Sequence, residues 1–138
     1  MACPLCQPEA ERILWRDDRC RVIRVADAHY HGYCRVIWHA HVAEMTDLTV
    51  PDRAHLMHIT LATEAAVRQV FSPTKINLAS LGNMVPHLHW HVIARYADDA
   101  HFPDPIWAEP KRAAPAQPAV SDTQLAIALT EEIGRMDD

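Results

Sequence analysis

The stretch His87-Leu88-His89-Trp90-His91-Val92-Ile93 constrains this chain most, because histidine alternates in it with large apolar residues. Side chains in a β-strand alternate between the two faces, so a strand places the three histidines in one row, with neighbours about 6–7 Å apart. The apolar residues between them then lie on the opposite face and can anchor the strand in a core. A helix spreads the same histidines over about 200° of arc. We therefore predict a strand over 87–93 that carries a candidate site.

Composition places the chain among ordinary globular proteins and excludes several functions. With 138 residues, of which 49% are hydrophobic and 22% charged, it fits a single globular body with a real core. A formal net charge of −5 argues against a bulk nucleic-acid binder but leaves room for a small anionic ligand. No run approaches 18 apolar residues, so no membrane association is expected. The N-terminus does not resemble a signal peptide, and we expect a cytoplasmic protein.

The first half of the chain predicts an antiparallel meander followed by a helix. Short apolar or β-rich runs lie at 13–15, 20–26 and 34–38, and their connections are too short for parallel crossovers. Thr49 can cap a helix that runs with near 3.6-residue apolar spacing to Phe71, where Ser72-Pro73 ends it. An alternating run at 75–80 then predicts a fourth strand, and the residues 81–86 connect it to the histidine strand.

The chain changes character after Tyr96. Residues 97–120 contain five prolines and predict irregular surface chain. Ser121-Asp122-Thr123-Gln124 matches a capping box, and the apolar stripe that follows predicts a short amphipathic helix. We accordingly divide the chain into a domain at 1–110 and a C-terminal tail with this helix at 111–138.

Three chemistries are open to the histidine row. It could bind a metal, although one flat strand brings three imidazoles poorly to one ion. It could perform nucleophilic catalysis at phosphorus, since a neutral imidazole is a competent nucleophile near neutral pH. It could also be a solvated face without function. Two nearby features suit an anionic ligand: Gly82-Asn83 predicts a turn that can offer backbone N–H groups, and the parity of Asn77 places it on the histidine face.

A second cluster is predicted at the N-terminus. Cys3-Pro4-Leu5-Cys6 is a C-x-x-C motif, which fits half of a zinc site, a redox pair or two structural thiols. A zinc half-site suits its position before a polar run, and His41 is then a candidate third ligand. In a chain without export signals, the four cysteines are interpreted as thiols or metal ligands rather than disulfides.

The motif His-apolar-His-apolar-His-apolar-apolar at 87–93 resembles the signature of the histidine triad (HIT) superfamily. The resemblance extends over about residues 3–95, through the C-x-x-C motif, the strand from Gly32, His41, the helix, Asn77 and Gly82. It implies an α+β fold: a five-stranded antiparallel sheet with one long helix, often as a homodimer. It also implies a bacterial HIT-type nucleotide hydrolase that acts at the α-phosphate of dinucleoside polyphosphates or related nucleotidyl esters and amidates.

The resemblance assigns roles to individual residues of this chain. His89 would be the nucleophile that forms a nucleotidyl-histidine intermediate, His91 would contact the phosphate, and His87 would orient the site or bind zinc. Substrate would be bound by Asn77, by the phosphate loop at Gly82, Asn83 and Met84, and by Asp27 at the ribose. Cys3, Cys6, His41 and His87 match a structural zinc site of several bacterial branches, and no organic cofactor is expected.

Two departures from the family pattern refine this expectation. Met84 stands where some branches carry a serine that assists the leaving group, which weakens the case for phosphoramidate substrates. The third triad residue is histidine rather than glutamine, which favours hydrolysis over nucleotidyl transfer. The alternative from another class is a nucleotide- or zinc-binding interaction protein with little turnover.

Overall fold

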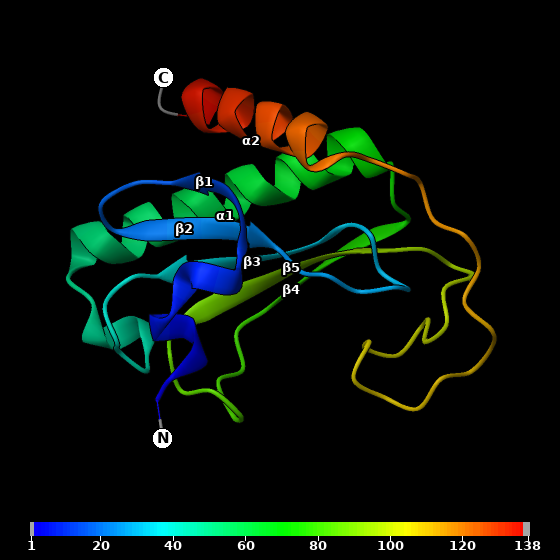
Figure 1. Ribbon diagram of the computed structural model, residues 1–138, viewed down its shortest axis with the longest axis horizontal. Helices are drawn as coiled ribbons and strands as arrows, with labels where there is room; N and C mark the ends of the chain where they lie inside the picture. The colour runs from blue at the N-terminus through cyan, green and yellow to red at the C-terminus, as the bar shows by residue number, and fades with distance from the viewer. Residues whose placement is uncertain (1, 137–138) are drawn as a thin grey trace.

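The chain folds into one antiparallel sheet with two helices on the same side (Figure 1). The computed structural model describes residues 2–136. The strands are β1 (Arg12–Arg16), β2 (Cys20–Arg24), β3 (Tyr33–Trp38), β4 (Lys75–Ala79) and β5 (His89–Arg95), and the helices are α1 (Val50–Phe71) and α2 (Asp122–Met136). The strand order is β1-β2-β3-β5-β4, with every neighbouring pair antiparallel. The prediction of a five-stranded α+β fold with a long helix and a short C-terminal helix is therefore confirmed.

The alternation of side chains gives the sheet one face that packs beneath α1 and an opposite face that carries the histidines. Leu88, Val92 and Ala94 are buried in the core beneath α1, together with Val22 and Val36 of the neighbouring strands. The opposite face of β5 carries His89, His91 and Ile93. The β3 register adds three residues to this face, with Ile37 opposite His89, Arg35 opposite His91 and Tyr33 opposite Ile93. The core thus fixes the strand that presents the histidines.

Helix α1 has the boundaries that its capping residues predict. The Thr49 hydroxyl accepts the Asp52 backbone N–H at 3.3 Å, and Ser72 ends the helix in a left-handed conformation with φ of 47°. Helix α2 begins in the same way, because Ser121 Oγ accepts the Gln124 backbone N–H at 3.1 Å. Figure 1 shows α2 lying alongside α1, and its buried Leu125 belongs to the main core.

The predicted strand over 87–93 is wrong by two residues at each end, since β5 runs from His89 to Arg95. His87 precedes the strand because the chain turns sharply there, with its backbone N–H donating to Val85 O at 2.8 Å. Sheet-like bonding begins at the next residue, where Leu88 O accepts the Trp38 N–H at 3.2 Å. The His87 side chain therefore does not lie in the same row as those of His89 and His91, which are on β5.

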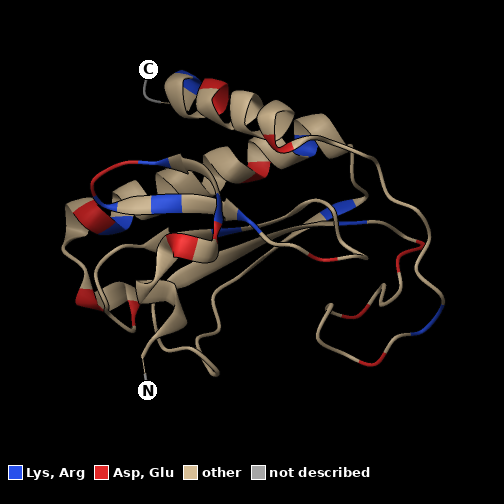
Figure 2. Cartoon of the chain, viewed as in Figure 1, with Lys and Arg blue, Asp and Glu red and all other residues tan. Residues whose placement is uncertain are grey.

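Charged residues are dispersed over the molecule. Figure 2 shows Lys and Arg on several elements rather than collected along one of them. Within residues 2–136, no helix is both long and apolar enough to span a bilayer. The exclusion of bulk nucleic acid and the cytoplasmic location stay predictions.

Candidate active site

His89 and His91 open into a pocket of about 490 Å³ at one end of the sheet. Its walls come from four parts of the chain: the N-terminal turn, β3, the connection 81–86 and the tail. The lining residues are Pro4, Leu5, Arg35, Leu81, Gly82, Asn83, Met84, Val85, His89, His91 and Trp107. None of these is acidic and one is a fixed cation, so the pocket suits an anion.

The hydrogen bonds of His89 determine its tautomer. His89 Nδ1 lies 2.6 Å from the backbone oxygen of His87. A carbonyl can only accept a hydrogen bond, so Nδ1 carries the proton and Nε2 keeps its lone pair. The ring is 6% exposed and lines the pocket, which makes Nε2 available to an electrophile there. This is the state that a nucleophilic imidazole needs.

His91 is held by a residue that sequence reasoning missed. Its Nδ1 lies 3.1 Å from the buried Tyr33 hydroxyl, and its ring centroid lies 4.8 Å from that of His89. When the Tyr33 O–H donates to Nδ1, the proton of neutral His91 resides on Nε2. His91 can then donate a hydrogen bond to a phosphate oxygen beside His89.

The environment keeps both histidines neutral near neutral pH. Burial lowers the pKa of His91 to about 4, and the neighbouring His89 and Arg35 act in the same direction. Burial also lowers the pKa of His89, opposed by its bond to the His87 carbonyl and reinforced by Arg35. Neutral imidazoles next to a cation are suited to nucleophilic attack on an anionic phosphate. They are poorly suited to act as general acids, because they carry no extra proton.

The predicted phosphate loop forms part of the pocket wall. Gly82, Asn83 and Met84 line it, and Gly82 adopts a φ of 73°, which favours glycine. In the described part of the chain, no hydrogen bond occupies the backbone N–H groups of these three residues. They are available to an anion, as the turn dipeptide predicts.

Two predicted substrate-binding residues lie away from this pocket. Asn77 is on the histidine face, as its parity predicts, but its Oδ1 accepts a bond from Arg95 Nη1 at 2.8 Å. Asp27 lies in the connection between β2 and β3, where its Oδ1 accepts the backbone N–H groups of His29 and Tyr30 at 2.8 and 3.1 Å. It lines a separate pocket next to Arg24. Their roles in binding substrate stay predictions.

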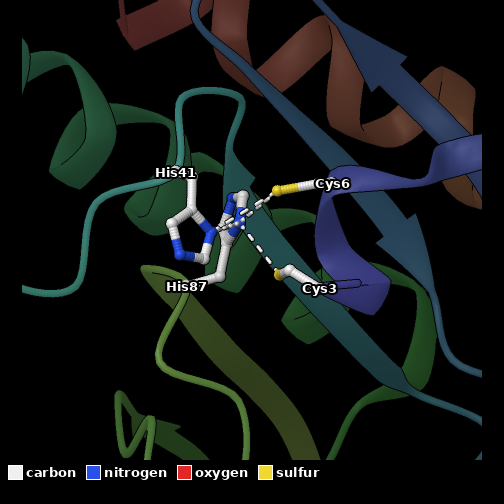
Figure 3. Close-up of side chains that lie close together, drawn as sticks. All are labelled: Cys3, Cys6, His41 and His87. Carbon is white, nitrogen blue, oxygen red and sulfur yellow. Dashed lines mark hydrogen bonds between the residues drawn. The ribbon is translucent and has the colours of Figure 1, made fainter. Parts of the chain in front are cut away.

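The four predicted zinc ligands are brought together (Figure 3). Cys3 precedes the first turn, η1 (Pro4–Cys6), and Cys6 is its last residue, while His41 follows β3 and His87 precedes β5. His87 Nδ1 lies 3.4 Å from each cysteine Sγ and 3.2 Å from His41 Nδ1. Sites separated by more than eighty residues in sequence thus converge on one point.

The chemistry of this cluster fits a zinc ion. His87 Nε2 donates to the backbone oxygen of Trp38 at 2.6 Å, so its Nδ1 lone pair faces the two thiols and His41. Ligands of a tetrahedral zinc lie about 3.3–3.8 Å apart, given Zn–N of about 2.0–2.1 Å and Zn–S of about 2.3 Å. The observed spacings of 3.2 and 3.4 Å agree with that geometry. A carbonyl behind a ligating imidazole is also the usual supporting contact.

Sequence reasoning gave no role to Tyr33, which contacts His91, or to Arg35 and Trp107, which line the pocket. Arg35 interrupts an otherwise apolar strand, which is a signal that the sequence does carry. Its role depends on the pairing of β3 with β5, which sequence alone does not provide. Trp107 lies in the proline-rich stretch predicted as irregular surface chain, yet its ring centroid is 5.1 Å from that of His91.

The family model of the HIT domain matches residues 7–98. The chain belongs to the HIT domain family. The match contains β1 to β5, α1 and the two histidines of the pocket, whereas Trp107 and α2 lie beyond it.

Solved structures of histidine triad proteins resemble this chain. A histidine triad protein from Sinorhizobium meliloti 1021 superimposes with a TM-score of 0.71 at 27% identity, covering 88% of this chain and 89% of that one. A histidine triad protein from Marinobacter aquaeolei VT8 gives 0.70 at 26% identity, covering 91% and 90%. A Zn-bound histidine triad family protein from Mycobacterium smegmatis shares the fold at 17% identity, with a TM-score of 0.64 and coverage of 99% and 96%.

A curated protein called AP-4-A phosphorylase, from Mycobacterium tuberculosis, is 31% identical over 77 residues. The alignment covers 51% of this chain and 40% of that protein. The match therefore spans about two fifths of the relative's length.

Proposed function

We propose that this HIT-domain chain is a nucleotide hydrolase that cleaves dinucleoside polyphosphates or related nucleotidyl esters at the α-phosphate. The observation that carries the proposal is the 2.6 Å bond from His89 Nδ1 to the His87 carbonyl, which leaves the Nε2 lone pair in an anion-suited pocket. The match to a family of nucleotide-processing proteins and the AP-4-A phosphorylase relative support the substrate class.

The reaction consists of two displacements at phosphorus. His89 Nε2 attacks the α-phosphorus, the N–P bond forms, and the bond to the bridging oxygen breaks with its electron pair leaving on the departing nucleotide. Water then attacks the nucleotidyl-His89 intermediate, the N–P bond breaks, and the nucleoside monophosphate departs with the oxygen of that water. The proton of the water passes to solvent or to the returning imidazole.

The other residues of the pocket stabilise the charge that develops on phosphorus. His91 donates from Nε2 to a nonbridging oxygen, because Tyr33 occupies its Nδ1. The backbone N–H groups at 82–84 donate to the phosphate, and the Arg35 guanidinium offsets part of the charge of the polyphosphate chain. Arg35 Nε is buried without a hydrogen-bond partner in the described structure, so a ligand oxygen can satisfy it.

Zinc is proposed as a structural component rather than a reactant. Cys3, Cys6, His41 and His87 would hold it, and the ion would supply a crosslink between the N-terminal turn and the sheet. The homodimer stays a prediction from the resemblance.

Phosphorolysis is a second candidate, because the curated relative is called a phosphorylase. In that reaction inorganic phosphate replaces water in the second displacement, and the product is a nucleoside diphosphate. Since His89 acts identically in both reactions, the two candidates differ only in the acceptor.

The test is a product analysis with diadenosine tetraphosphate, with and without inorganic phosphate. Hydrolysis yields AMP and ATP, and phosphorolysis yields ADP and ATP. Quenching with denaturant at alkaline pH traps the adenylyl-His89 protein, because acid would cleave its N–P bond. His89→Asn should lose at least about a thousandfold in turnover while it still binds AMP. Unchanged turnover in that variant would show that another group is the nucleophile. Zinc and AMP binding without any cleavage would favour the interaction protein instead.

A further inference from the structure

Trp107 separates two pockets. It lines the pocket of His89 and His91, and with Leu81 it also lines a second pocket of about 430 Å³. The second pocket lies along the edge strand β4 and includes Asn77 and Pro105. The two pockets thus share a wall made of one indole and one leucine.

Trp107 and Leu81, which form the wall between the two pockets, expose apolar surface next to the histidines. Trp107 is 49% exposed and Leu81 is 53% exposed, although both are large apolar side chains. The indole meets the His91 ring at 5.1 Å with an interplanar angle of 68°, which is an edge-to-face contact. Exposed aromatic surface beside a phosphate-binding pocket suits a flat base, because bases stack on aromatic side chains regardless of sequence.

The segment that carries Trp107 is held rigidly by a buried arginine. Arg95, at the end of β5, is 2% exposed and pairs with Asp99 through Nε and Nη2 at 2.8 and 2.9 Å. Its Nη2 also donates to Asp104 O at 2.7 Å, and its Nη1 to Asn77 at 2.8 Å. The tail is therefore tied to the same strand that carries His89 and His91, and Trp107 is placed by the sheet rather than by a free loop.

We infer that Trp107 and Leu81 form a subsite for the nucleobase of the departing nucleotide. This inference rests on the proposed function for its ligand class, a molecule with two nucleosides joined by a polyphosphate. One nucleotide presents its α-phosphate to His89 in the first pocket, and the polyphosphate leads past the wall to the second. The base of the leaving nucleotide then stacks on the indole from the side of β4. Leu81 lies within the HIT-domain match at 7–98, and Trp107 lies in the segment that follows it.

Two substrates that differ only in the second nucleoside test the inference. Diadenosine tetraphosphate presents a leaving base, whereas adenosine tetraphosphate presents the same reacting phosphate without one. Loss of one stacking contact predicts that Trp107→Ala lowers the ratio of kcat/KM for these two substrates about tenfold. Trp107→Phe should restore most of the ratio. Ile127→Ala, on the exposed face of α2, serves as the control for removal of an exposed apolar group.

A binding measurement separates this inference from the proposed function. A nonhydrolysable diadenosine tetraphosphate and AMP are titrated against the wild-type protein and Trp107→Ala. Selective loss of dinucleotide affinity, about tenfold, supports the subsite even if the protein proves to have no turnover. Equal effects of Trp107→Ala on both ligands, or on both substrates, would overturn it, because the indole would then act only by supporting His91.

Discussion

Two of the three histidines in the motif have their tautomers fixed by backbone carbonyls. His89 donates from Nδ1 to His87 O, and His87 donates from Nε2 to Trp38 O, so their lone pairs lie at opposite nitrogens. The lone pair of His89 faces the pocket lined by Arg35 and Trp107, and that of His87 faces the thiols. Adjacent members of one alternating motif thereby serve different sites. The backbone rather than the residue type makes this distinction, which is why the sequence left the role of His87 open.

The tautomer of the third histidine, His91, depends on the Tyr33 side chain, and this dependence predicts the effect of removing one hydroxyl group. Tyr33→Phe removes the hydroxyl on His91 Nδ1 but keeps the ring, so both imidazole tautomers become accessible. We expect kcat to fall about tenfold or more with a smaller change in KM, because the donor to the transition state is then wrongly placed. Tyr96→Phe is the matched control, since its hydroxyl donates to Phe71 O at the end of α1. Equal kinetic losses in both variants would contradict the role of Tyr33.

The low pKa of His91 also predicts a pH dependence of stability. Burial holds that pKa at about 4, below its usual 6.5, so the unfolded chain binds the proton more readily than the folded one. The free energy of unfolding is therefore highest above about pH 6.5. Protonation of His91 in the unfolded chain lowers it by up to about 3 kcal/mol as the pH drops towards 4. The titratable or charged groups that face this ring are His89, Arg35 and Tyr33.

Urea unfolding of chelator-treated protein between pH 7 and 4 measures this effect. His91→Gln should make the decline shallower, because it removes one titrating group while His89, whose pKa is also lowered by burial, remains. His29→Gln, at an exposed position between β2 and β3, should leave the decline intact. A slope that is identical in wild type and His91→Gln would assign the acid sensitivity to other groups.

At the scale of elements, local signals were sufficient for most boundaries. Thr49 and Ser121 act as predicted at the helix starts, and the short connections specify the meander correctly. These signals lie within a few residues of the feature that they determine. The end of β5 and the placement of the tail depend on Arg95 and its partners, which lie up to eighteen residues away in sequence. No local pattern predicts such contacts.

Helix α2 gives a prediction about the extent of the folding unit. Leu129 is 1% exposed in the main core, whereas Ile127 on the same helix is 56% exposed. Leu129→Ala should cost about 2–4 kcal/mol in the free energy of unfolding, and Ile127→Ala less than about 0.5 kcal/mol. Circular dichroism during urea unfolding should show a single transition in both variants. An early separate loss of helix signal would instead support the division of the chain after residue 110, which stays a prediction.

For the whole molecule, the N-terminal turn connects the two sites. Cys3 and Cys6 face His87, while Pro4 and Leu5 between them line the pocket of His89 and His91. Arg21 fastens the same turn, donating to Leu5 O at 2.7 Å and to Glu11 at 2.6 Å. The C-x-x-C motif predicted a cluster with His41 and His87, but its contribution to the pocket wall depends on packing against β2 that the sequence does not reveal.

The last prediction follows from this double role. Purified protein should contain about one equivalent of zinc, and Cys6→Ser should lose it because the site then lacks one thiolate. Removal of zinc by a chelator should lower the thermal midpoint by several degrees, as expected when a ligand that binds the folded state is withdrawn. It should also raise KM more than it lowers kcat, since Leu5 then leaves the pocket wall while the His89–His87 bond persists. Cys34→Ala, at a buried thiol outside the cluster, is the control and should keep its zinc. Protein that contains no zinc as purified and gains no thermal stability from added zinc would contradict the metal site, and it would leave the assignment of His89 as the nucleophile unaffected.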